Sequence, residues 1–467
     1  FNERYDIDRC LAAIAKGSYK NIALQFPDEL LPDSVQVAAT LAERSGRKCQ
    51  VLADTTFGSC CVDEIAAEHG EADLIIHYGG ACLSPTSRLP VIYVFGKSAA
   101  DIPQCVEAFE QRFKTEFERN ILLMFDVQYH YIAGKSLAHS PSCVSATPPL
   151  PSEISSQLPP PKTSVRGSRW YSLPDGHAIE NYDIFYLGPE SLSLTNIMMT
   201  HSRCKVYSFN PAAGESREES ASVNRLLMRR YMMVQKARDA DVIGIVVGTL
   251  GVASYLSVIN DVKRLILASG KKPYVLAVGK PNPAKLGNFL EIDAFVLVAC
   301  PENSLIDSRD FFRPIVTPFE LELALVPGRE WDGSYETDIA SLALRLRTEA
   351  DAALEDARGK VERREAQEDA DEDSDDEPYF SLVTGAYKKK SRLVSVAAPS
   401  GDGAEDAGQV TLRNKETGVA VFRADSAAAD FLRERRTFRG LETRLGETSV
   451  SVAIEGRAGI ARGYSHE

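Results

Sequence analysis

The sequence predicts an α/β protein made of three similar Rossmann-like parallel-sheet domains, followed by a C-terminal extension that contributes little core. Short runs rich in Val, Ile and Leu alternate with helical stretches, which is typical of buried parallel strands. Three of these runs resemble one another, because an Asp precedes each apolar run and a polar, Gly or Pro turn follows it. They are ADLIIHYGGAC (72–82), YDIFYLGPES (182–191) and IDAFVLVACPE (292–302). The similarity indicates a small α/β unit that occurs three times.

The predicted strands assign the chain to three repeats, with limits near residues 112 and 215. The first repeat (1–112) has runs at 21–26, 49–54, 72–78 and 90–96. The second (113–215) has runs at 119–126, 182–188 and 204–210. The third (216–345) has runs at 241–248, 273–279, 293–300 and 313–318. Residues 346–467 form an acidic linker and tail in this interpretation.

Two segments lack the pattern of a core. A Pro- and Ser-rich stretch in the second repeat, at 140–168, is expected to be a disordered insertion. After Leu344 a charged helical stretch leads into the block Glu368–Glu377, which holds eight acids and no base and should be solvated. Beyond it, PYFSLVTGAY (378–387) has weak strand character, and 426–442 favours a short helix with a basic face. We expect this C-terminal quarter to be a largely disordered tail or a docking segment.

Charge and hydropathy exclude several classes of protein. The formal charge of the 467 residues is −13, and much of it belongs to the acidic block, so the remaining body is only mildly acidic. Such a body does not predict a nucleic-acid clamp. No apolar run approaches the roughly 18 residues that cross a bilayer, and residues 1–20 show no secretory pattern. The expected location is therefore cytoplasmic, with no membrane partner.

Nine cysteines are too few for a disulfide scaffold, and no CxxC pair occurs. Zinc-ribbon, thioredoxin-like and ferredoxin-like spacings are thereby excluded. Ligands of open parallel sheets bind outside the carboxyl ends of the strands. Four cysteines follow predicted strands at that edge, namely Cys60, Cys61, Cys82 and Cys300. The other five begin strands, lie in helical contexts or lie in the Pro/Ser segment, and are expected to be ordinary residues: Cys10, Cys49, Cys105, Cys143 and Cys204.

The four edge cysteines allow three interpretations. Soft thiolates bind zinc or iron–sulfur clusters, and three of them around a [4Fe–4S] cluster would leave one iron open. A thiol at the start of the helix that follows Cys61 would have a lowered pKa and could act as a nucleophile or redox group. Buried structural cysteines are the third possibility. His77, at the mouth of the strand before Cys82, could donate to a sulfur or carry a proton, and a core histidine is the alternative.

Two further features are weaker. GTLG (248–251) directly follows a predicted strand and could cradle an anion, or it could be a tight βα turn. The stretch 224–240 is a cationic helix that is expected to present a solvated face, through Arg225, Arg229, Arg230, Lys236 and Arg238. The sequence contains no P-loop, no GxGxxG and no Ser/His/Asp spacing.

Several strings, taken together, resemble the diphthamide-synthesis family in its eukaryotic 2-(3-amino-3-carboxypropyl)histidine synthase branch. They are LADTTFGSCCVDEIAAEH (52–69), ADLIIHYGGACLSP (72–85), VIGIVVGTLG (242–251), ACPENSLIDSRDFFRPIVTPFELELAL (299–325) and PYFSLVTGAY (378–387). The resemblance covers most of residues 20–325 and fragments of the tail. The motifs around Cys60, Cys61 and Cys300 are specific.

The resemblance implies three α/β domains in a pseudo-threefold arrangement. Catalytic members of this family hold a [4Fe–4S] cluster with one cysteine from each domain. With it they cleave S-adenosylmethionine to a 3-amino-3-carboxypropyl radical, which adds to a histidine of translation elongation factor 2. This reaction is the first step of diphthamide formation.

The sequence departs from the catalytic pattern in two places. The middle strand ends in YLGPESLS (186–193) without a cysteine. The resemblance therefore implies that Cys61, Cys82 and Cys300 hold the cluster, with Cys60 as an alternative to Cys61. The catalytic string GTLGRQG reads GTLGVAS (248–254) here, so Val252 stands where an arginine could hold a substrate carboxylate.

These departures favour a supporting subunit without catalytic residues of its own. It would hold a second [4Fe–4S] cluster that helps to reduce the cluster of a catalytic paralogue, diphthamide biosynthesis protein 1, and that paralogue would bind S-adenosylmethionine. The expected partners are this paralogue, elongation factor 2 as protein substrate and a small electron-donor protein. Two alternatives remain: a self-sufficient enzyme that cleaves S-adenosylmethionine by radical chemistry, or a structural partner whose thiols bind zinc or no metal.

Overall fold

The computed structural model divides the chain into two compact units, Phe1–Ala397 and Ala398–Glu467. The structure describes residues 1–53, 58–86, 88–113, 120–132, 143–145, 164–166, 169–171, 173–174, 176–249, 255–306, 309–365, 379–388, 412–413 and 420–421. In the second unit the described part is a short antiparallel pair, β18 (Leu412–Arg413) and β19 (Ala420–Val421). The acidic block and the basic helix expected at 426–442 lie outside the described residues.

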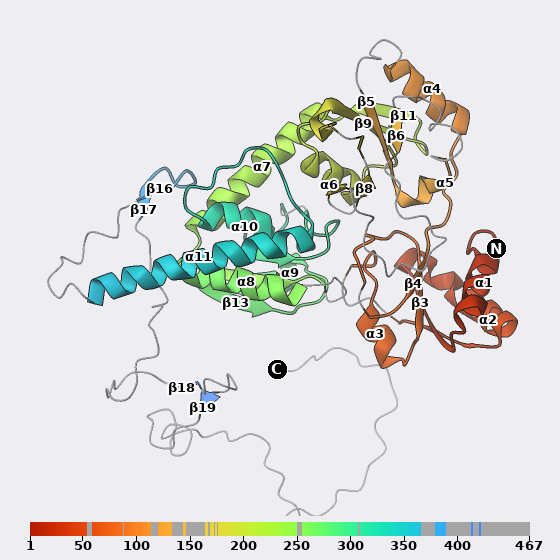
Figure 1. Cartoon of the computed structure of the whole chain (residues 1–467), viewed down its shortest axis with the longest axis horizontal. Helices are drawn as coiled ribbons and strands as arrows, with labels where there is room; N and C mark the ends of the chain where they lie inside the picture. Colours follow the sequence, from red (N-terminus) through yellow and green to blue (C-terminus); the bar gives the residue numbers. More distant parts are fainter. Residues whose placement is uncertain are drawn as a thin grey trace, which may run out of the picture. The chain divides into compact units, whose positions relative to one another are not determined.

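Three parallel sheets with the same strand order form the first unit (Figure 1). The first sheet has the order β2-β1-β3-β4 and the third has the order β13-β12-β14-β15. In the second sheet, β11-β10-β9-β5-β6, the antiparallel strand β11 extends one edge. In every sheet the first strand lies between the second and the third, and the fourth lies beside the third. The order therefore supports a repeated unit, as the similar strings predict.

Every run that was predicted to be a strand contains one. The strands of the first sheet are β1 (Asn21–Gln25), β2 (Lys48–Val51), β3 (Leu74–Tyr78) and β4 (Val91–Val94). Those of the second are β5 (Asn120–Phe125), β6 (Cys143–Ser145), β9 (Tyr182–Leu187), β10 (Val206–Asn210) and β11 (Glu215–Glu218). Those of the third are β12 (Val242–Val247), β13 (Lys272–Leu276), β14 (Ala294–Val298) and β15 (Ile315–Val316).

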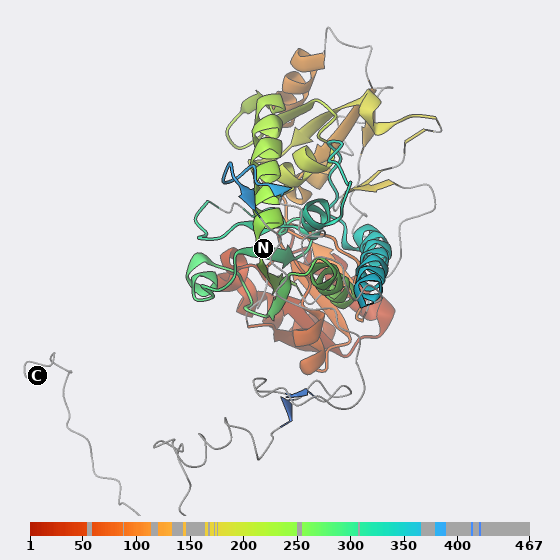
Figure 2. The ribbon, with the colours of Figure 1, turned by 90° about the vertical axis from the view of Figure 1, so that its left-hand side faces the viewer.

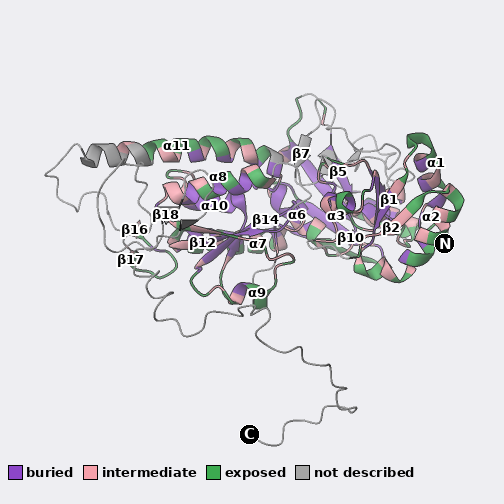
Figure 3. Cartoon of the chain, turned by 90° about the horizontal axis from the view of Figure 1, so that it is seen from below, coloured by how far each residue is buried: buried purple, intermediate pink, exposed green. Residues whose placement is uncertain are grey.

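Alternate residues of the central strands face two separate apolar layers, which explains why these runs are apolar throughout. In β1, Ile22 and Leu24 pack with α1 and α2, whereas Ala23 packs with Ala67 of α3 on the other face. The strands β12 and β14 of the third sheet are similarly buried (Figure 3).

The helices lie on the faces of the sheets. They are α1 (Ile7–Gly17), α2 (Ser34–Ser45), α3 (Glu64–His69), α4 (Ile102–Phe113), α5 (His130–Ile132), α6 (Leu192–Thr200), α7 (Ser220–Asp239), α8 (Tyr255–Ala268), α9 (Pro283–Gly287), α10 (Pro318–Leu325) and α11 (Ile339–Glu365). The long helix α11 (cyan) lies against α8, as both ribbon views show (Figures 1 and 2). The described helices include none that is long and apolar enough to span a bilayer.

The predicted limits of the repeats remain predictions, although the packing near them is informative. The limit near residue 112 falls inside α4, whose Phe109 and Phe113 pack against Ile121 and Phe185 of the second sheet. The limit near residue 215 falls at the first residue of β11, which pairs with β10.

The Pro/Ser-rich segment is predicted to be a disordered insertion, but part of it belongs to the second sheet. Residues 143–145 form β6, which pairs in parallel with β5 through Ile121 and Cys143. This strand occupies the place that β2 and β13 occupy in the other sheets. A second short pair, β7 (Ser164–Arg166) and β8 (Arg169–Tyr171), begins within the segment and ends just after it. The surrounding prolines obscured a three-residue strand that is visible only from its pairing.

The cationic helix α7 is not simply a solvated face, because one of its arginines is buried. The side chain of Arg230 is 8% exposed and forms an ion pair with the fully buried Glu320 of α10. Burial alone would lower the pKa of Arg230, but the Glu320 carboxylate outweighs it and raises that pKa above its ordinary value. Glu320 also accepts from the hydroxyl of Tyr335 at 2.8 Å and completes the capping box with Thr317.

The string PYFSLVTGAY folds as a small hairpin of β16 (Tyr379–Phe380) and β17 (Tyr387–Lys388). It docks on the C-terminal end of α7, where Lys388 Nζ donates to the carbonyl of Asp239 and the buried Ser381 donates to the carboxylate of the same residue. Of the two expectations for this string, tail or docking segment, the structure supports the second.

Candidate metal centre

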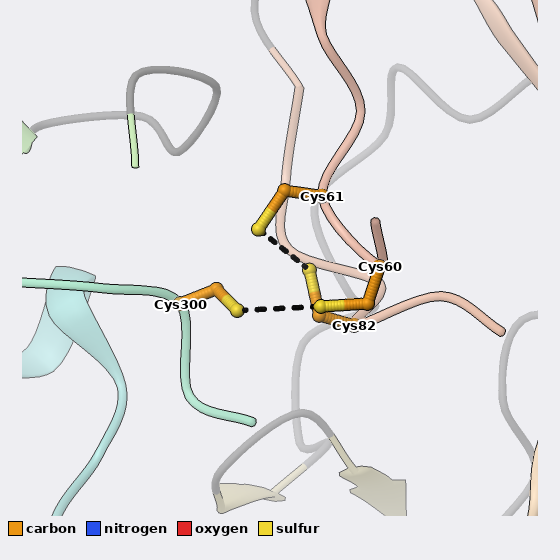
Figure 4. A group of neighbouring side chains, drawn as sticks. All are labelled: Cys60, Cys61, Cys82 and Cys300. Atoms are coloured by element: carbon orange, nitrogen blue, oxygen red, sulfur yellow. Dashed lines mark hydrogen bonds between the residues drawn. The ribbon is translucent and has the colours of Figure 1, made fainter. Parts of the chain in front are cut away.

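Four cysteine side chains meet at the carboxyl edge of the first and third sheets (Figure 4). Their sulfurs, from Cys60, Cys61, Cys82 and Cys300, all lie within 4.8 Å of one another. Cys60 Sγ is 3.7 Å from Cys300 Sγ, and Cys82 Sγ is 3.9 Å from Cys61 Sγ. Cys60 is half-buried and the other three are buried. The four thiols predicted from strand ends are thus brought together across 240 residues of sequence.

Cys82 and Cys300 occupy equivalent places in their repeats. Each follows the third strand of its sheet, β3 or β14, and that strand ends at the edge where ligands bind. The corresponding place after β9 in the second sheet is Gly188–Ser191, where the Ser191 hydroxyl caps α6. This stretch reads GPES and has no cysteine, so the equivalent position of the second repeat contributes no thiol to the group.

The two adjacent cysteines were expected to point different ways, with only one of them in the site, but both sulfurs lie in the group. Backbone contacts fix their turn. Gln25, at the end of β1, donates to the carbonyl of Cys61 at 2.7 Å and accepts from the N–H of Asp63 at 2.9 Å. The N–H of Cys82 donates to the carbonyl of Cys60 at 3.0 Å, so the two turns that carry these thiols are bonded directly.

Helix α3 begins after the two adjacent cysteines and not at them. Helix α3 begins at Glu64, and Asp63 caps it by accepting from the N–H of Ala66 at 2.9 Å. Cys60 and Cys61 precede this cap. Neighbouring thiols and burial shift the pKa values of Cys60, Cys82 and Cys300.

Contacts among the four thiols shift the pKa values of Cys82 and Cys300 in opposite directions. Hydrogen bonding from Cys300, Cys60 and Cys61 lowers the pKa of Cys82 well below its ordinary value. The same contacts and burial raise the pKa of Cys300 well above its ordinary value. The Cys82 thiol is therefore the more readily deprotonated of these two. A soft cation would replace the remaining protons, because metal ligation requires deprotonated thiols.

His77 forms a hydrogen bond with the backbone of the turn that carries the two adjacent cysteines. Its ring is fully buried, and Nε2 lies 3.1 Å from the carbonyl of Ser59, the residue before Cys60. Because a carbonyl only accepts, Nε2 carries the proton, and Nδ1 has no hydrogen-bond partner. Burial lowers the pKa of His77, which keeps the ring neutral. Its described contact is thus with the backbone of the turn and not with a sulfur.

The second repeat contributes helix α6, which holds the Cys300 turn. Asn196 Nδ2 donates to the carbonyl of Pro301 at 2.6 Å. Ser193 Oγ donates to the carboxylate of Glu302 at 2.7 Å. All three repeats therefore touch the site, although only two supply sulfur.

Asn303 also belongs to the site, although it was not among the predicted site residues. Its side-chain Nδ2 donates to Cys60 Sγ at 3.0 Å and lies 3.4 Å from Cys300 Sγ. A Cβ at Gly58 would lie 2.1 Å from this nitrogen, so a glycine is needed there. The available signal was an amide three residues after a strand-end cysteine, and spacing alone does not show where that amide points.

The structure describes Gly248 and Thr249 of the turn GTLG, and the expected anion site there stays a prediction. The N–H of Gly248 donates to the carbonyl of Val298 at 2.8 Å, and a Cβ at Gly248 would lie 2.8 Å from Leu297. Close packing thus accounts for this glycine. The rest of the string, including Val252, lies outside the described residues. The remaining described cysteines pack in apolar clusters away from the site, as expected: Cys10, Cys49, Cys105 and Cys204.

The fold and the site together define a class of protein: an α/β protein of repeated parallel sheets, with a buried four-thiol group that could hold a soft metal. The chain belongs to the diphthamide synthesis family, because the family model for diphthamide synthesis proteins matches residues 26–336.

Relatives of known name agree with this assignment. The chain is 43% identical to subunit 2 of the 2-(3-amino-3-carboxypropyl)histidine synthase from Gallus gallus, over 100% of this chain and 93% of the relative. It is 42% identical to the subunit of the same name from Schizosaccharomyces pombe, over 100% of this chain and 91% of the relative. Its fold is similar to the crystal structure of Dph2 from Pyrococcus horikoshii with a 4Fe-4S cluster. That match has a TM-score of 0.54 at 20% identity and covers 72% of this chain and 94% of that chain.

Separate replacement of Cys60 and Cys61 by Ser tests how the adjacent thiols divide their roles. With three or more ligands available from four thiols, each single variant is expected to retain part of its metal, whereas the double variant loses it. Metal per chain, measured after anaerobic reconstitution, checks this expectation. Cys61 is the predicted ligand, so Cys61→Ser should lose more metal than Cys60→Ser. The opposite order would assign the role to Cys60.

Proposed function

We propose that this chain is the iron–sulfur subunit of a two-subunit synthase that transfers the 3-amino-3-carboxypropyl group of S-adenosylmethionine to a histidine of elongation factor 2. In this proposal it is the accessory subunit, and its cluster passes an electron to the cluster of its catalytic paralogue. The four-thiol group carries the proposal. The similarity to synthase subunit 2 sequences over the whole chain supports it.

The residues present suit a [4Fe–4S] cluster. All four candidate ligands are thiols, which is the donor set that such clusters use. Cys82 and Cys300 would ligate it together with Cys61, and Cys60 is the alternative to Cys61. When bound, the cluster supplies one-electron chemistry. The protein contributes burial, the fixed turns around the sulfurs and an amide that donates to two of them.

Two features favour an accessory role over independent catalysis. The second repeat offers Gly188–Ser191 where catalytic members have a cysteine, and Val252 replaces the arginine that could hold a substrate carboxylate. In this proposal S-adenosylmethionine binds to the paralogue.

The remaining partners follow from the same proposal. A small electron-donor protein reduces the cluster of this chain, and the paralogue modifies elongation factor 2 in the cytoplasm. The three repeats stand in a pseudo-threefold arrangement around the site.

A zinc site is the second candidate, and the sulfur spacing favours it. Four thiolates about 2.3 Å from one zinc ion in tetrahedral geometry lie about 3.8 Å apart. Two sulfur pairs in this structure, Cys60 with Cys300 and Cys82 with Cys61, are 3.7 and 3.9 Å apart. A four-iron cluster is larger than a single ion, so its ligands would have to spread. If the four thiols bind zinc, this chain is a structural partner of the paralogue with no redox role.

Anaerobic purification followed by metal and sulfide analysis separates the two candidates. We expect about four iron atoms and four sulfides per chain and a reduced-state electron paramagnetic resonance signal. In the complex with the paralogue, the iron should be twice that of either subunit alone. One zinc per chain without sulfide would overturn the iron–sulfur proposal. Modification of elongation factor 2 by this chain alone, with S-adenosylmethionine and dithionite, would overturn the accessory role.

A further inference from the structure

Asn303 is the described side chain that donates hydrogen bonds to two sulfurs of the site from different repeats. Its Nδ2 lies 3.0 Å from Cys60 Sγ and 3.4 Å from Cys300 Sγ. An amide nitrogen carries two hydrogens, so it can serve both acceptors at once. No other contact seen at the site links the sulfurs of the first and third repeats through a side chain that cannot itself be a thiolate.

We infer that Asn303 is a positioning residue that makes the cluster of this subunit easier to reduce. The inference rests on the proposed iron–sulfur function. Hydrogen bonds to ligand sulfurs stabilise negative charge on them. Reduction adds one electron and no proton, so the reduced cluster carries one more negative charge than the oxidised cluster. Donors aimed at the sulfurs therefore stabilise the reduced form more and raise the reduction potential.

The surroundings hold the amide in place. The N–H of Asn303 donates to the carbonyl of Cys300 at 3.1 Å, and the next residue, Ser304, donates to the same carbonyl at 3.0 Å. The Ser304 hydroxyl donates to the carbonyl of Pro301 at 2.9 Å, and Asn196 of the second repeat donates there too. The turn is therefore fixed by backbone and side-chain bonds before any metal binds, and the amide has little freedom to turn away.

The backbone at Gly58 accommodates the same amide. The space that a Cβ would fill at this position contains the Asn303 amide, with Nδ2 only 2.1 Å from the ideal Cβ position. Gly58 also accepts from the N–H of Cys61 at 3.1 Å, so it belongs to the cysteine turn. Because Gly58 of the first repeat has no side chain, the Asn303 amide of the third repeat fits beside it.

In the proposed function, this chain accepts and passes on one electron at a time. One electron enters from the reduced small donor protein, which is oxidised by one electron. One electron later leaves for the paralogue's cluster, and no bond in this chain forms or breaks. Asn303 sets how readily the first transfer occurs, because its N–H groups face the sulfurs on which the added charge is shared.

The test measures the reduction midpoint of full-length, cluster-loaded protein by a redox titration followed by electron paramagnetic resonance. The variants are Asn303→Ala, which removes the donors, Asn303→Asp, which keeps the shape and places a carboxylate on the sulfurs, and Gly58→Ala, which displaces the amide. Asn224→Ala, an exposed change on α7, is the matched control. We expect full iron and sulfide with a shift to more negative potential in all three variants, largest for Asn303→Asp, and no shift in the control.

The outcomes separate this inference from the proposed function. Wild-type protein without iron and sulfide would overturn the proposed function. A cluster that is loaded but unshifted in Asn303→Ala, or in Asn303→Asp and Gly58→Ala if the Ala variant loses iron, would overturn the role of Asn303 alone. Loss of iron in all three variants, with the control intact, would also overturn it, because Asn303 would then serve cluster assembly and not the potential.

Discussion

Replacement of Cys82 or Cys300 by Ser is expected to abolish cluster binding by this chain. Each thiol is the single one that its strand end delivers, whereas Cys60 and Cys61 can substitute for one another. A serine hydroxyl fills nearly the same space but is a poor ligand for a soft metal. Iron and acid-labile sulfide per chain should fall by more than about tenfold in either variant. Activity of the reconstituted pair should fall with them.

A matched control keeps this prediction sharp. Cys49→Ser changes a half-buried cysteine of β2 that packs in the apolar layer of the first repeat, away from the sulfur group. We expect it to retain the iron content of the wild type. If Cys82→Ser and Cys300→Ser both kept normal iron and sulfide, the proposed ligand set would be wrong, whatever the activity.

The second large effect is expected from Arg230→Met, which should lower the free energy of unfolding by about 3–5 kcal/mol. The change leaves the carboxylate of Glu320 fully buried and without its arginine, and the guanidinium contact with the carbonyl of Ile315 at 3.2 Å is lost as well. An uncompensated buried charge costs far more than the ion pair contributes. Urea denaturation followed by circular dichroism measures the loss.

Two companion variants test the reason for this loss. Arg203→Met breaks an exposed pair with Asp332, whose side chains are 49% and 64% exposed, and should cost no more than about 1 kcal/mol. Glu320→Gln removes the buried charge, so the double variant with Arg230→Met should be more stable than the two single effects added together. Strict additivity would show that the pair does not act as a unit.

Much of the fold could be predicted from local sequence. Each parallel strand is a short apolar run, because a strand covered on both faces needs apolar side chains at every position. Such runs as ADLIIHY and DAFVLVAC show this requirement without any long-range information. The failure at β6 has the opposite cause. Cys143–Ser145 is a strand only because β5 offers it a pairing edge, and its own composition signals an irregular segment.

The candidate site was predicted in part for a similar reason. Strand ends can be read from sequence, so Cys60, Cys61, Cys82 and Cys300 could be placed at one edge of the sheets. Side-chain direction cannot be read in this way. The sequence did not show that both adjacent thiols would point inward, or that Asn303 would donate to two of them.

The sequence by itself determined the α/β class, the strands of the three repeats apart from β6 and β11, the family and the thiols that can meet. Each of these depends on residue type and local order, which the chain carries directly. The tertiary structure alone decided that Arg230 is buried against Glu320, that α6 of the second repeat holds the Cys300 turn, and that Gly58 leaves room for Asn303. These depend on contacts between residues far apart in the chain, where only the packing of one surface on another sets direction and distance.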